Sequence, residues 1–320
     1  AGLGPAPYAG MVLADMGATV IKVERVGGGN DLFPAPRNTE VLDRGKQSIE
    51  LDLKSEAGRE ILQSLVSGAD AVIEGFRPGV MERLGLGPEE ALASNPALVY
   101  GRITGWGQEG PLAQTAGHDI DYIAVAGALG SIGSAEPVVP LNLVADFAGG
   151  GMFLVSGVLA GVIAARTTGV GSVVDAAMVD CVAQLMSMMH GGRAAVWWRA
   201  GRGLNPLDGT APFYSVYETA DGEHMAVGAL EPKFFAELIE RLDLDDGWRL
   251  RQYDQSAWPE LRTVLETTFI RRTRAEWIEV FADGDACVAP VMSMTEATEH
   301  PHLAARGTFV DVDGVIQPAP

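Results

Sequence analysis

Residues 69–103, ADAVIEGFRPGVMERLGLGPEEALASNPALVYGRI, decide the fold class of this chain. Residues 69–74 and 98–103 have the pattern of strands, and residues 88–94 between them have the pattern of a short helix. A strand, a helix and a second strand in this order form a βαβ unit, in which the two strands run parallel.

The same alternation continues upstream of this stretch. Residues 7–16 have a short apolar helix pattern, and residues 19–24 form a strand that ends in a charge. Residues 55–67 are an amphipathic helix, and Ser55 is suited to cap its N-terminus. We therefore expect an α/β fold with a Rossmann-like parallel sheet.

Two helical stretches follow downstream. Residues 147–165 carry no charge, follow Asp146 directly and contain the spacing Gly157-x-x-x-Gly161. Their length reaches the lower bound for a membrane span, but their glycine content and their isolation in an acidic chain favour a buried central helix. Residues 175–193 are predicted as a second helix, rich in methionine.

The C-terminal third changes character. The glycine and polar content rises between residues 199 and 208, which suggests a linker. Beyond it, we expect a small α+β module with a hairpin over 213–227 and amphipathic helices around 232–241, 257–269 and 273–282.

Composition limits the function. The 320 residues are 47% hydrophobic and 20% charged, which excludes a disordered chain. A formal charge of −19 argues against nucleic acid and anionic membranes as partners. Two cysteines cannot form a disulfide framework, so a reducing cytoplasm fits best. P-loop, Gly-x-Ser-x-Gly and Cys-x-x-Cys motifs are absent, and His300 and His302 have no third ligand at a convincing spacing, so we expect no metal.

Four cations stand where strands give way to loops: Arg25, Lys54, Arg77 and Arg83. Ligands of α/β sheets bind at such strand ends, so grouped cations would suit a polyphosphate. Ordinary solvated side chains remain the somewhat favoured alternative on spacing alone.

Three further residues allow two interpretations each. His118 on its own is more often a hydrogen-bonded structural residue. Asp146 precedes the apolar helix and is suited to be its N-cap, although in a cavity it could transfer protons. Glu231 precedes Pro232 at an apparent helix start and has the same capping interpretation.

Seven stretches together resemble the CaiB/BaiF family, the family III CoA transferases, and within it the α-methylacyl-CoA racemase branch. They are LADMGATVIKVE at 13–24, LDLK at 51–54, EGFRPGVMERLG at 74–85, TGWGQ at 104–108, AGHDI at 116–120, NLVAD at 142–146 and DAAMVD at 175–180. They cover nearly the whole chain in order.

The resemblance implies a domain organisation. A large CoA-binding domain would span 1–180, with 303–320 returning to it, a linker of helix and loop would span 181–204, and a small α+β domain 205–302. Two such protomers would interlock as a homodimer. The chain starts without Met inside an apparent strand-to-helix turn and stops at Pro320, so we expect a fragment lacking an upstream strand and a downstream element.

The resemblance also implies a CoA site. Arg25 would meet the adenosine and 3′-phosphate, Leu51, Asp52, Leu53 and Lys54 would surround the adenine, and Gly75, Phe76, Arg77 and Arg83 would line the pyrophosphate and pantetheine path. Gly117 and Tyr122 are also expected to bind CoA. Arginine forks match phosphate oxygens, which supports the polyphosphate interpretation of the strand-end cations.

The histidine at position 118 selects the racemase branch, because the transferases of the family usually carry an apolar residue there. A racemase needs acid/base groups on both faces of the α-carbon, and His118 with Asp146 would supply them. Glu231, from the partner subunit, would orient His118, and a backbone N–H near Asp119 would stabilise the enolate. We therefore expect an epimerase of 2-methylacyl-CoA that needs no metal and no cofactor beyond the CoA moiety of its substrate.

Two alternatives stay open at this point. A family III CoA transferase would use Asp146 as a nucleophile through an acyl anhydride, and a catalytically inert paralogue would only bind acyl-CoA. Met186, Met188 and Met189 could form a pliable floor for the acyl chain, but plain core packing is at least as favoured.

Overall fold

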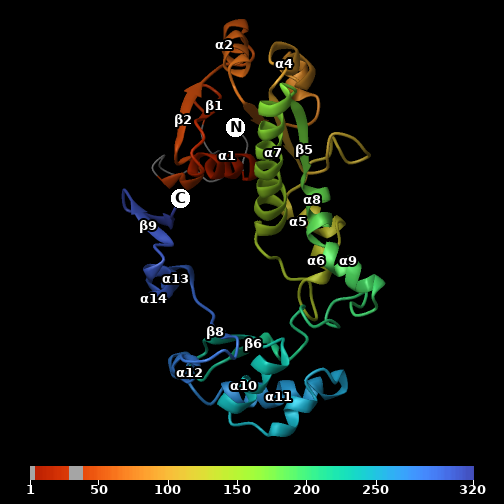
Figure 1. Cartoon of the computed structure of the whole chain (residues 1–320), viewed down its shortest axis with the longest axis vertical. Helices are drawn as coiled ribbons and strands as arrows, with labels where there is room; N and C mark the ends of the chain where they lie inside the picture. Colours follow the sequence, from red (N-terminus) through yellow and green to blue (C-terminus); the bar gives the residue numbers. More distant parts are fainter. Residues whose placement is uncertain (1–3, 29–38) are drawn as a thin grey trace. The chain divides into compact units, whose positions relative to one another are not determined.

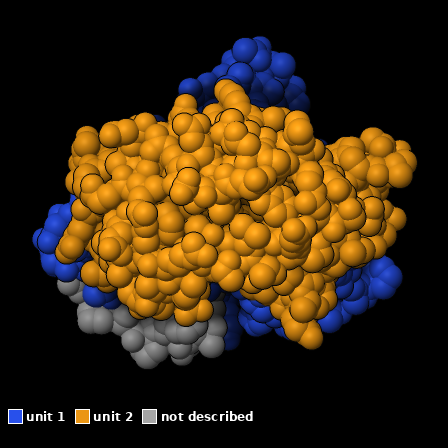
Figure 2. All heavy atoms as spheres, turned by 90° about the horizontal axis from the view of Figure 1, so that it is seen from below, with its two compact units in different colours: residues 1–129, 139–188, 310–320 blue, residues 130–138, 189–309 orange. Residues whose placement is uncertain are grey.

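The computed structural model describes residues 4–28 and 39–320 (Figure 1). The chain divides into two compact units, which Figure 2 colours separately. Unit 1 comprises Ala1–Leu129, Val139–Met188 and Val310–Pro320, and unit 2 comprises Gly130–Val138 and Met189–Phe309.

Unit 1 has parallel strands, as the βαβ pattern predicts. The strands β3 (Ala71–Glu74), β4 (Val99–Thr104) and β5 (Ser172–Ala177) form one parallel sheet in this order, with β4 buried along its whole length. A second parallel pair consists of β1 (Val20–Glu24) and β2 (Lys46–Glu50). The α/β fold class is confirmed.

Helices cover these sheets. Those of unit 1 are α1 (Pro5–Asp15), α2 (Glu56–Ser67), α3 (Val80–Arg83), α4 (Pro88–Ser94), α5 (Asp119–Val125), α6 (Ala128–Ser131), which runs into unit 2, α7 (Met152–Thr168), α8 (Met178–Leu185), the 3-10 turn η2 (Val41–Asp43) and the π-helix η3 (Leu143–Gly151). Ser55 caps α2 by accepting a hydrogen bond from the Gly58 N–H, as predicted.

Helix α7 lies along β4 and β5 (Figure 1). A Cβ placed on Gly157 would lie 2.6 Å from Val174, and one on Gly161 would lie 2.9 Å from Val99, so the two glycines let the helix approach the sheet closely. Leu143–Thr168 is the one stretch of the described residues long and apolar enough to cross a membrane, with a mean hydropathy of 1.9. Only 33% of its most apolar window is buried, so α7 covers β4 and β5 with one face and is not the fully buried central helix expected from the sequence.

Two predicted helices were wrong in their bounds. The stretch expected as one helix over 147–165 is divided between the π-helix η3, which ends at Gly151, and α7, which begins at Met152. Asn142 is the N-cap residue of η3, so Asp146 lies within its first turn and is not an N-cap. The helix expected over 175–193 begins only at Met178, because Asp175 pairs with Arg102 as part of strand β5. A new helix, α9 (Ser187–Ala194), follows α8.

Unit 2 contains the predicted hairpin and helices around an aromatic core. Strands β6 (Tyr214–Glu218), β7 (His224–Gly228) and β8 (Val288–Pro290) form an antiparallel sheet in this order. The helices are α10 (Pro232–Arg241), α11 (Trp258–Phe269), α12 (Arg274–Phe281), α13 (Met294–Glu299) and α14 (Pro301–Ala305), with 3-10 turns η4 (Asp246–Leu250) and η5 (Gln255–Ala257). Phe213, Phe235 and Phe269 are fully buried between sheet and helices.

The last residues belong to unit 1. Strands β9 (Phe309–Val312) and β10 (Val315–Pro318) pair with each other, and β9 begins at the boundary between the units. Arg44 connects β10 to α1, because it pairs with Asp15 at 2.5 Å and also donates to Gln317 and to the carbonyl of Pro318.

Candidate active site

The candidate site lies in unit 1, where α5, the π-helix η3 and the N-terminus of α1 approach one another. Helix α5 packs against η3, and η3 packs against α1. A Cβ on Gly4, the N-cap residue of α1, would lie 3.1 Å from Oδ2 of Asp146. A Cβ on Gly75, which follows β3, would lie 3.4 Å from that of Ala6. The loop after β3 and the carboxylate of Asp146 therefore border the same end of α1.

His118 is presented by the start of α5. Its backbone is extended at the N-cap position, and its N–H donates to the carboxylate of Asp121 at 2.9 Å, which stabilises the first turn. Its side chain is exposed. The backbone just before it is held by Tyr122, whose hydroxyl donates to the carbonyl of Gly117 at 2.5 Å. The imidazole is therefore available to a ligand while its backbone is fixed.

Glycine makes room for Tyr122 beneath this turn. A Cβ on Gly105, directly after β4, would lie 2.1 Å from the tyrosine ring. The Trp106 ring meets the Tyr122 ring edge-on at 4.9 Å between centroids. Burial raises the pKa of Tyr122 to about 12, and the negative charge of Asp146 contributes to the shift, whereas Arg77 opposes it. Tyr122 is thus a neutral wall of the site near both Asp146 and Arg77.

Asp146 is half-buried and its carboxylate has a dedicated donor. Asn142, four residues earlier, donates from Nδ2 to Oδ2 at 2.9 Å. Burial raises the pKa of Asp146 above its ordinary value, the Asn142 hydrogen bond acts against this shift, the charge of Asp119 adds to it and His118 lowers it. The carboxyl group therefore holds its proton to a higher pH than a solvated aspartate, which suits a group that both donates and accepts protons.

Asp119 connects the two catalytic candidates. Its side chain is 4% exposed, and its Oδ2 accepts hydrogen bonds from the backbone N–H of Ala145 at 2.7 Å and of Asp146 at 2.8 Å. Since Asp119 follows His118 directly, this carboxylate joins the start of α5 to the first turn of η3.

A buried ion-pair network lies under the loop that follows β3. Arg102 of β4 pairs with Glu74 at 2.8 Å and with Glu82 of α3 at 2.8 Å, and the second Glu74 oxygen accepts the backbone N–H of Phe76 at 2.8 Å. Burial raises the pKa of Glu74, although the Phe76 N–H and Arg102 oppose the shift. The network fixes the backbone of Gly75, Phe76 and the following turn.

The expected CoA-binding cations fall into two groups. Arg77 and Arg83 follow β3, whereas Arg25 and Lys54 follow β1 and β2, the strands of the other parallel pair. All four side chains are exposed. The turn Leu51–Lys54 is rigid, because the Lys54 N–H donates to Asp52, and Arg59 donates to the carbonyls of Leu53 and Lys54.

The remaining candidates lie elsewhere. Glu231 belongs to unit 2, where it is the N-cap residue of α10, and its exposed side chain makes no capping hydrogen bond within the described helix. Met186 packs on the core of unit 1, and Met188 is 52% exposed. No group of three or more His, Cys, Asp or Glu in the described part of the chain could hold a metal ion.

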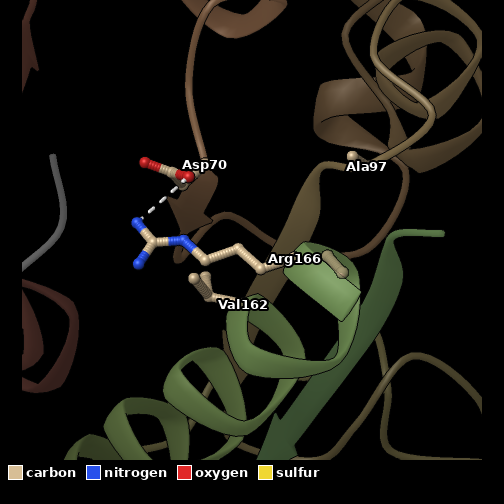
Figure 3. A pocket seen from close by; sticks show the side chains of 5 residues that line it. Asp70, Ala97, Val162 and Arg166 are labelled. Carbon is tan, nitrogen blue, oxygen red and sulfur yellow. Dashed lines mark ion pairs between the residues drawn. The ribbon is translucent and has the colours of Figure 1, made fainter. Parts of the chain in front are cut away.

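A separate surface hollow of unit 1 is not this site. It is lined by Asp70, Ala97, Val162, Ala165 and Arg166, and Asp70 and Arg166 form an exposed ion pair across it (Figure 3). Its volume of about 70 Å³ is far below what a CoA thioester fills.

Asn142 and the Glu74–Arg102–Glu82 network were not predicted from the sequence. The amide stands four residues before the carboxylate it serves, within NLVAD, and this spacing is the signal that was available. Charged residues inside the apolar pattern of β3 and β4 were the signal for the network.

Comparison with known proteins adds an independent finding. The sequence model of CoA-transferase family III matches residues 1–318. Alpha-methylacyl-CoA racemase from Mus musculus is 44% identical over 322 residues, covering 100% of this chain and 82% of that protein. Its namesake from Homo sapiens is 44% identical over 324 residues, covering 100% and 83%. A crystal structure of a CAIB/BAIF family protein from Brucella suis matches with a TM-score of 0.84 and 28% identity, covering 100% of this chain and 89% of that one.

Proposed function

Because this chain belongs to CoA-transferase family III, we propose that it is a racemase that interconverts the (2R) and (2S) epimers of 2-methylacyl-CoA thioesters. The observation that carries the proposal is the pairing of His118 with Asp146 by the Asp119 hydrogen bonds between α5 and η3. Its support is the 44% identity to two proteins named alpha-methylacyl-CoA racemase.

The chemistry is a 1,1-proton transfer. The thioester carbonyl acidifies the α-hydrogen, one of the pair His118 and Asp146 removes it, and the other protonates the opposite face of the planar enolate. The backbone N–H of Asp119, at the first position of α5, would donate to the enolate oxygen. The raised pKa of Asp146 supports this role, since the same group must act as base in one direction and as acid in the other.

The CoA moiety would run along the carboxyl ends of the strands. Gly75, Phe76, Arg77 and Arg83 would bind its pyrophosphate and pantetheine, with Gly117 and Tyr122 bordering the thioester, and Arg25 and Leu51–Lys54 would bind its adenosine part. The rigid turns after β2 and β3 support this assignment, because a preformed backbone lowers the entropic cost of binding. The carboxyl edge of parallel strands is where α/β proteins bind such ligands.

We further propose an interlocked homodimer in which Glu231 of the partner subunit orients His118. The exposed side chain of Glu231, free of a capping bond to α10, supports this role. The cytoplasmic location expected from Cys181 and Cys287, which are both free thiols, stays a prediction.

A CoA transferase is the second candidate, because the matching family model carries that name and the proposed nucleophile, Asp146, is in place. One experiment separates the candidates. A single epimer of a 2-methylacyl-CoA is incubated with the protein in D₂O without an acceptor acid. A racemase incorporates deuterium at the α-carbon while optical purity is lost. If no deuterium enters but CoA moves once a second acid is added, the transferase is correct; bound but unchanged thioester leaves an acyl-CoA-binding protein.

The hydrogen bond from Asn142 yields a pH prediction. Removing it in Asn142→Ala is expected to raise the pKa of Asp146 further, because the bond favours the charged carboxylate. In the direction in which Asp146 is the base, lowering the pH protonates it and reduces kcat/KM, and in the variant this acidic limb is expected at a higher pH than in the wild type. A rate loss of about tenfold corresponds to one hydrogen bond to a charged group. An acidic limb that stays in place in the variant would refute this role of Asn142.

A further inference from the structure

We propose that Asp119 is a positioning residue for Asp146: its buried carboxylate clamps the first turn of η3 to α5 and places a fixed negative charge beside the Asp146 carboxyl group. The catalytic part of this inference rests on the proposed function. The role differs from that of the Asp119 backbone N–H, since it belongs to the side chain.

The first observation is the shape of the clamp. One oxygen, Oδ2, accepts two consecutive backbone N–H groups, those of Ala145 and Asp146, at 2.7 and 2.8 Å. These N–H groups belong to the first turn of η3, where a helix has no backbone acceptors of its own. The carboxylate thus replaces the missing turn, and it does so from the residue that follows His118. A single side chain, that of Asp119, therefore connects the backbone next to His118 with the backbone N–H of Asp146.

The second observation is the other oxygen. Oδ1 of Asp119 is buried and has no hydrogen-bond partner among residues 4–28 and 39–320. A buried carboxylate oxygen without a donor costs stability, and such exceptions are rare in folded proteins. An asparagine would place its amide NH₂ at this same position, where it would lack an acceptor, so an amide would meet a similar cost. The aspartate therefore differs from an asparagine mainly in its negative charge, which acts on the neighbouring Asp146.

The third observation is the electrostatic surrounding of Asp146. Helix α5 contributes His118, Asp119 and Tyr122 to the surroundings of η3, and Asn142 stands at its N-cap. From α1, the ring of Tyr8 lies 4.9 Å from that of Phe147. From α8, Cys181 lies close enough that a Cβ added to Gly149 would be 3.4 Å from its Cβ. Burial raises the pKa of Tyr122 to about 12 and of Cys181 to about 11, so both are neutral near pH 7. Burial is the main cause of the raised pKa of Asp146, and among the described residues the negative charge of Asp119 adds to it.

Two variants separate the clamp from the charge. In Asp119→Asn, the amide oxygen can still accept both N–H groups, but the charge is gone, so we expect Asp146 to titrate at a lower pH. In Asp119→Ala both are lost, and we expect kcat to fall about 100-fold with KM unchanged, because a small displacement of a catalytic group has this effect. Asp70→Asn, which removes one charge of the exposed Asp70–Arg166 pair, is the matched control. It should leave both the titration of Asp146 and kcat unchanged.

The primary readout does not depend on activity. In protein labelled with ¹³C at aspartate carboxyl groups, the Asp146 signal is identified by its loss in Asp146→Asn and titrated by NMR. A lower midpoint in Asp119→Asn than in the wild type and in Asp70→Asn supports the proposal, and an unchanged midpoint overturns it. Thermal melting verifies that each variant is folded, and faster amide exchange at Ala145 and Asp146 in Asp119→Ala tests the clamp even if Asp119→Asn does not fold; unchanged amide exchange there overturns the clamp.

The activity assay then separates this inference from the proposed function. If the wild type incorporates α-deuterium, the acidic limb of kcat/KM in Asp119→Asn is expected to move to lower pH together with the NMR midpoint. If the wild type incorporates none while the NMR midpoint still shifts, the racemase assignment fails and the effect of the Asp119 charge on Asp146 stands.

Discussion

Replacing His118 by alanine is expected to lower the rate of epimer interconversion by a factor of about 10² to 10⁴, the usual contribution of a general acid or base. The imidazole would serve one face of the α-carbon, opposite the face served by Asp146. Because the side chain is exposed and only the backbone of His118 takes part in the first turn of α5, the fold should persist. The measurement is the loss of optical purity of a single 2-methylacyl-CoA epimer.

The control for this prediction is His302→Ala. His302 is exposed on α14 in unit 2 and takes no part in the proposed chemistry. The His302→Ala variant should interconvert the epimers at the wild-type rate. A His118→Ala protein that does the same would remove His118 from the mechanism.

Replacing Arg102 by methionine is expected to reduce the free energy of unfolding by about 3–5 kcal/mol, because one partner of a buried ion pair is left without compensation. The side chains of Arg102 and Glu74 are 7% and 3% exposed, so Glu74 cannot recover solvation. The loss should shrink as the pH is lowered, because burial raises the pKa of Glu74 and its protonated form is cheaper to bury. Urea unfolding at several pH values measures both effects.

Arg166→Met is the matched control for the network. Arg166 and Asp70 are 71% and 69% exposed at 3.6 Å, and such a surface pair contributes at most about 1 kcal/mol. Equal losses of stability in the two variants would show that the Glu74–Arg102–Glu82 network does not support the fold. A lower affinity for CoA in Arg102→Met at a temperature where it is folded would indicate that the network also positions the turn after β3.

The fold could be predicted wherever the sequence has a clear period. The parallel strands β3 and β4, the capped helix α2 and the hairpin of unit 2 all follow from local pattern. Strand β2 could not be predicted in this way, because KQSIE is largely polar and pairs with β1 through backbone hydrogen bonds. The apolar pattern does not distinguish a π-helix from an α-helix, and the Asp119 carboxylate that holds the first turn of η3 is distant in sequence.

For the candidate site, single residues could be predicted from the sequence, but the contacts between them could not. His118 and Asp146 stand out through a resemblance that assigns each a role, but their coupling depends on hydrogen bonds between residues 26 and 27 positions apart. The strand-end cations were recognised one by one, whereas their division between two parallel sheets follows from strand pairing. Asn142 belongs to the NLVAD stretch at 142–146, and only the structure shows that its amide donates to the Asp146 carboxylate.

In the proposed mechanism two groups serve opposite faces of one α-carbon, and deuterium exchange measured on each epimer separately shows whether they do. Each of the variants His118→Ala and Asp146→Asn is incubated with pure (2R) and pure (2S) thioester in D₂O. A two-base mechanism predicts a crossed result: each variant still exchanges the α-hydrogen of one epimer without inverting it, and the two variants retain exchange at opposite epimers. Loss of exchange at the same epimer in both variants, or inversion at the wild-type rate in either, would contradict the two-base mechanism.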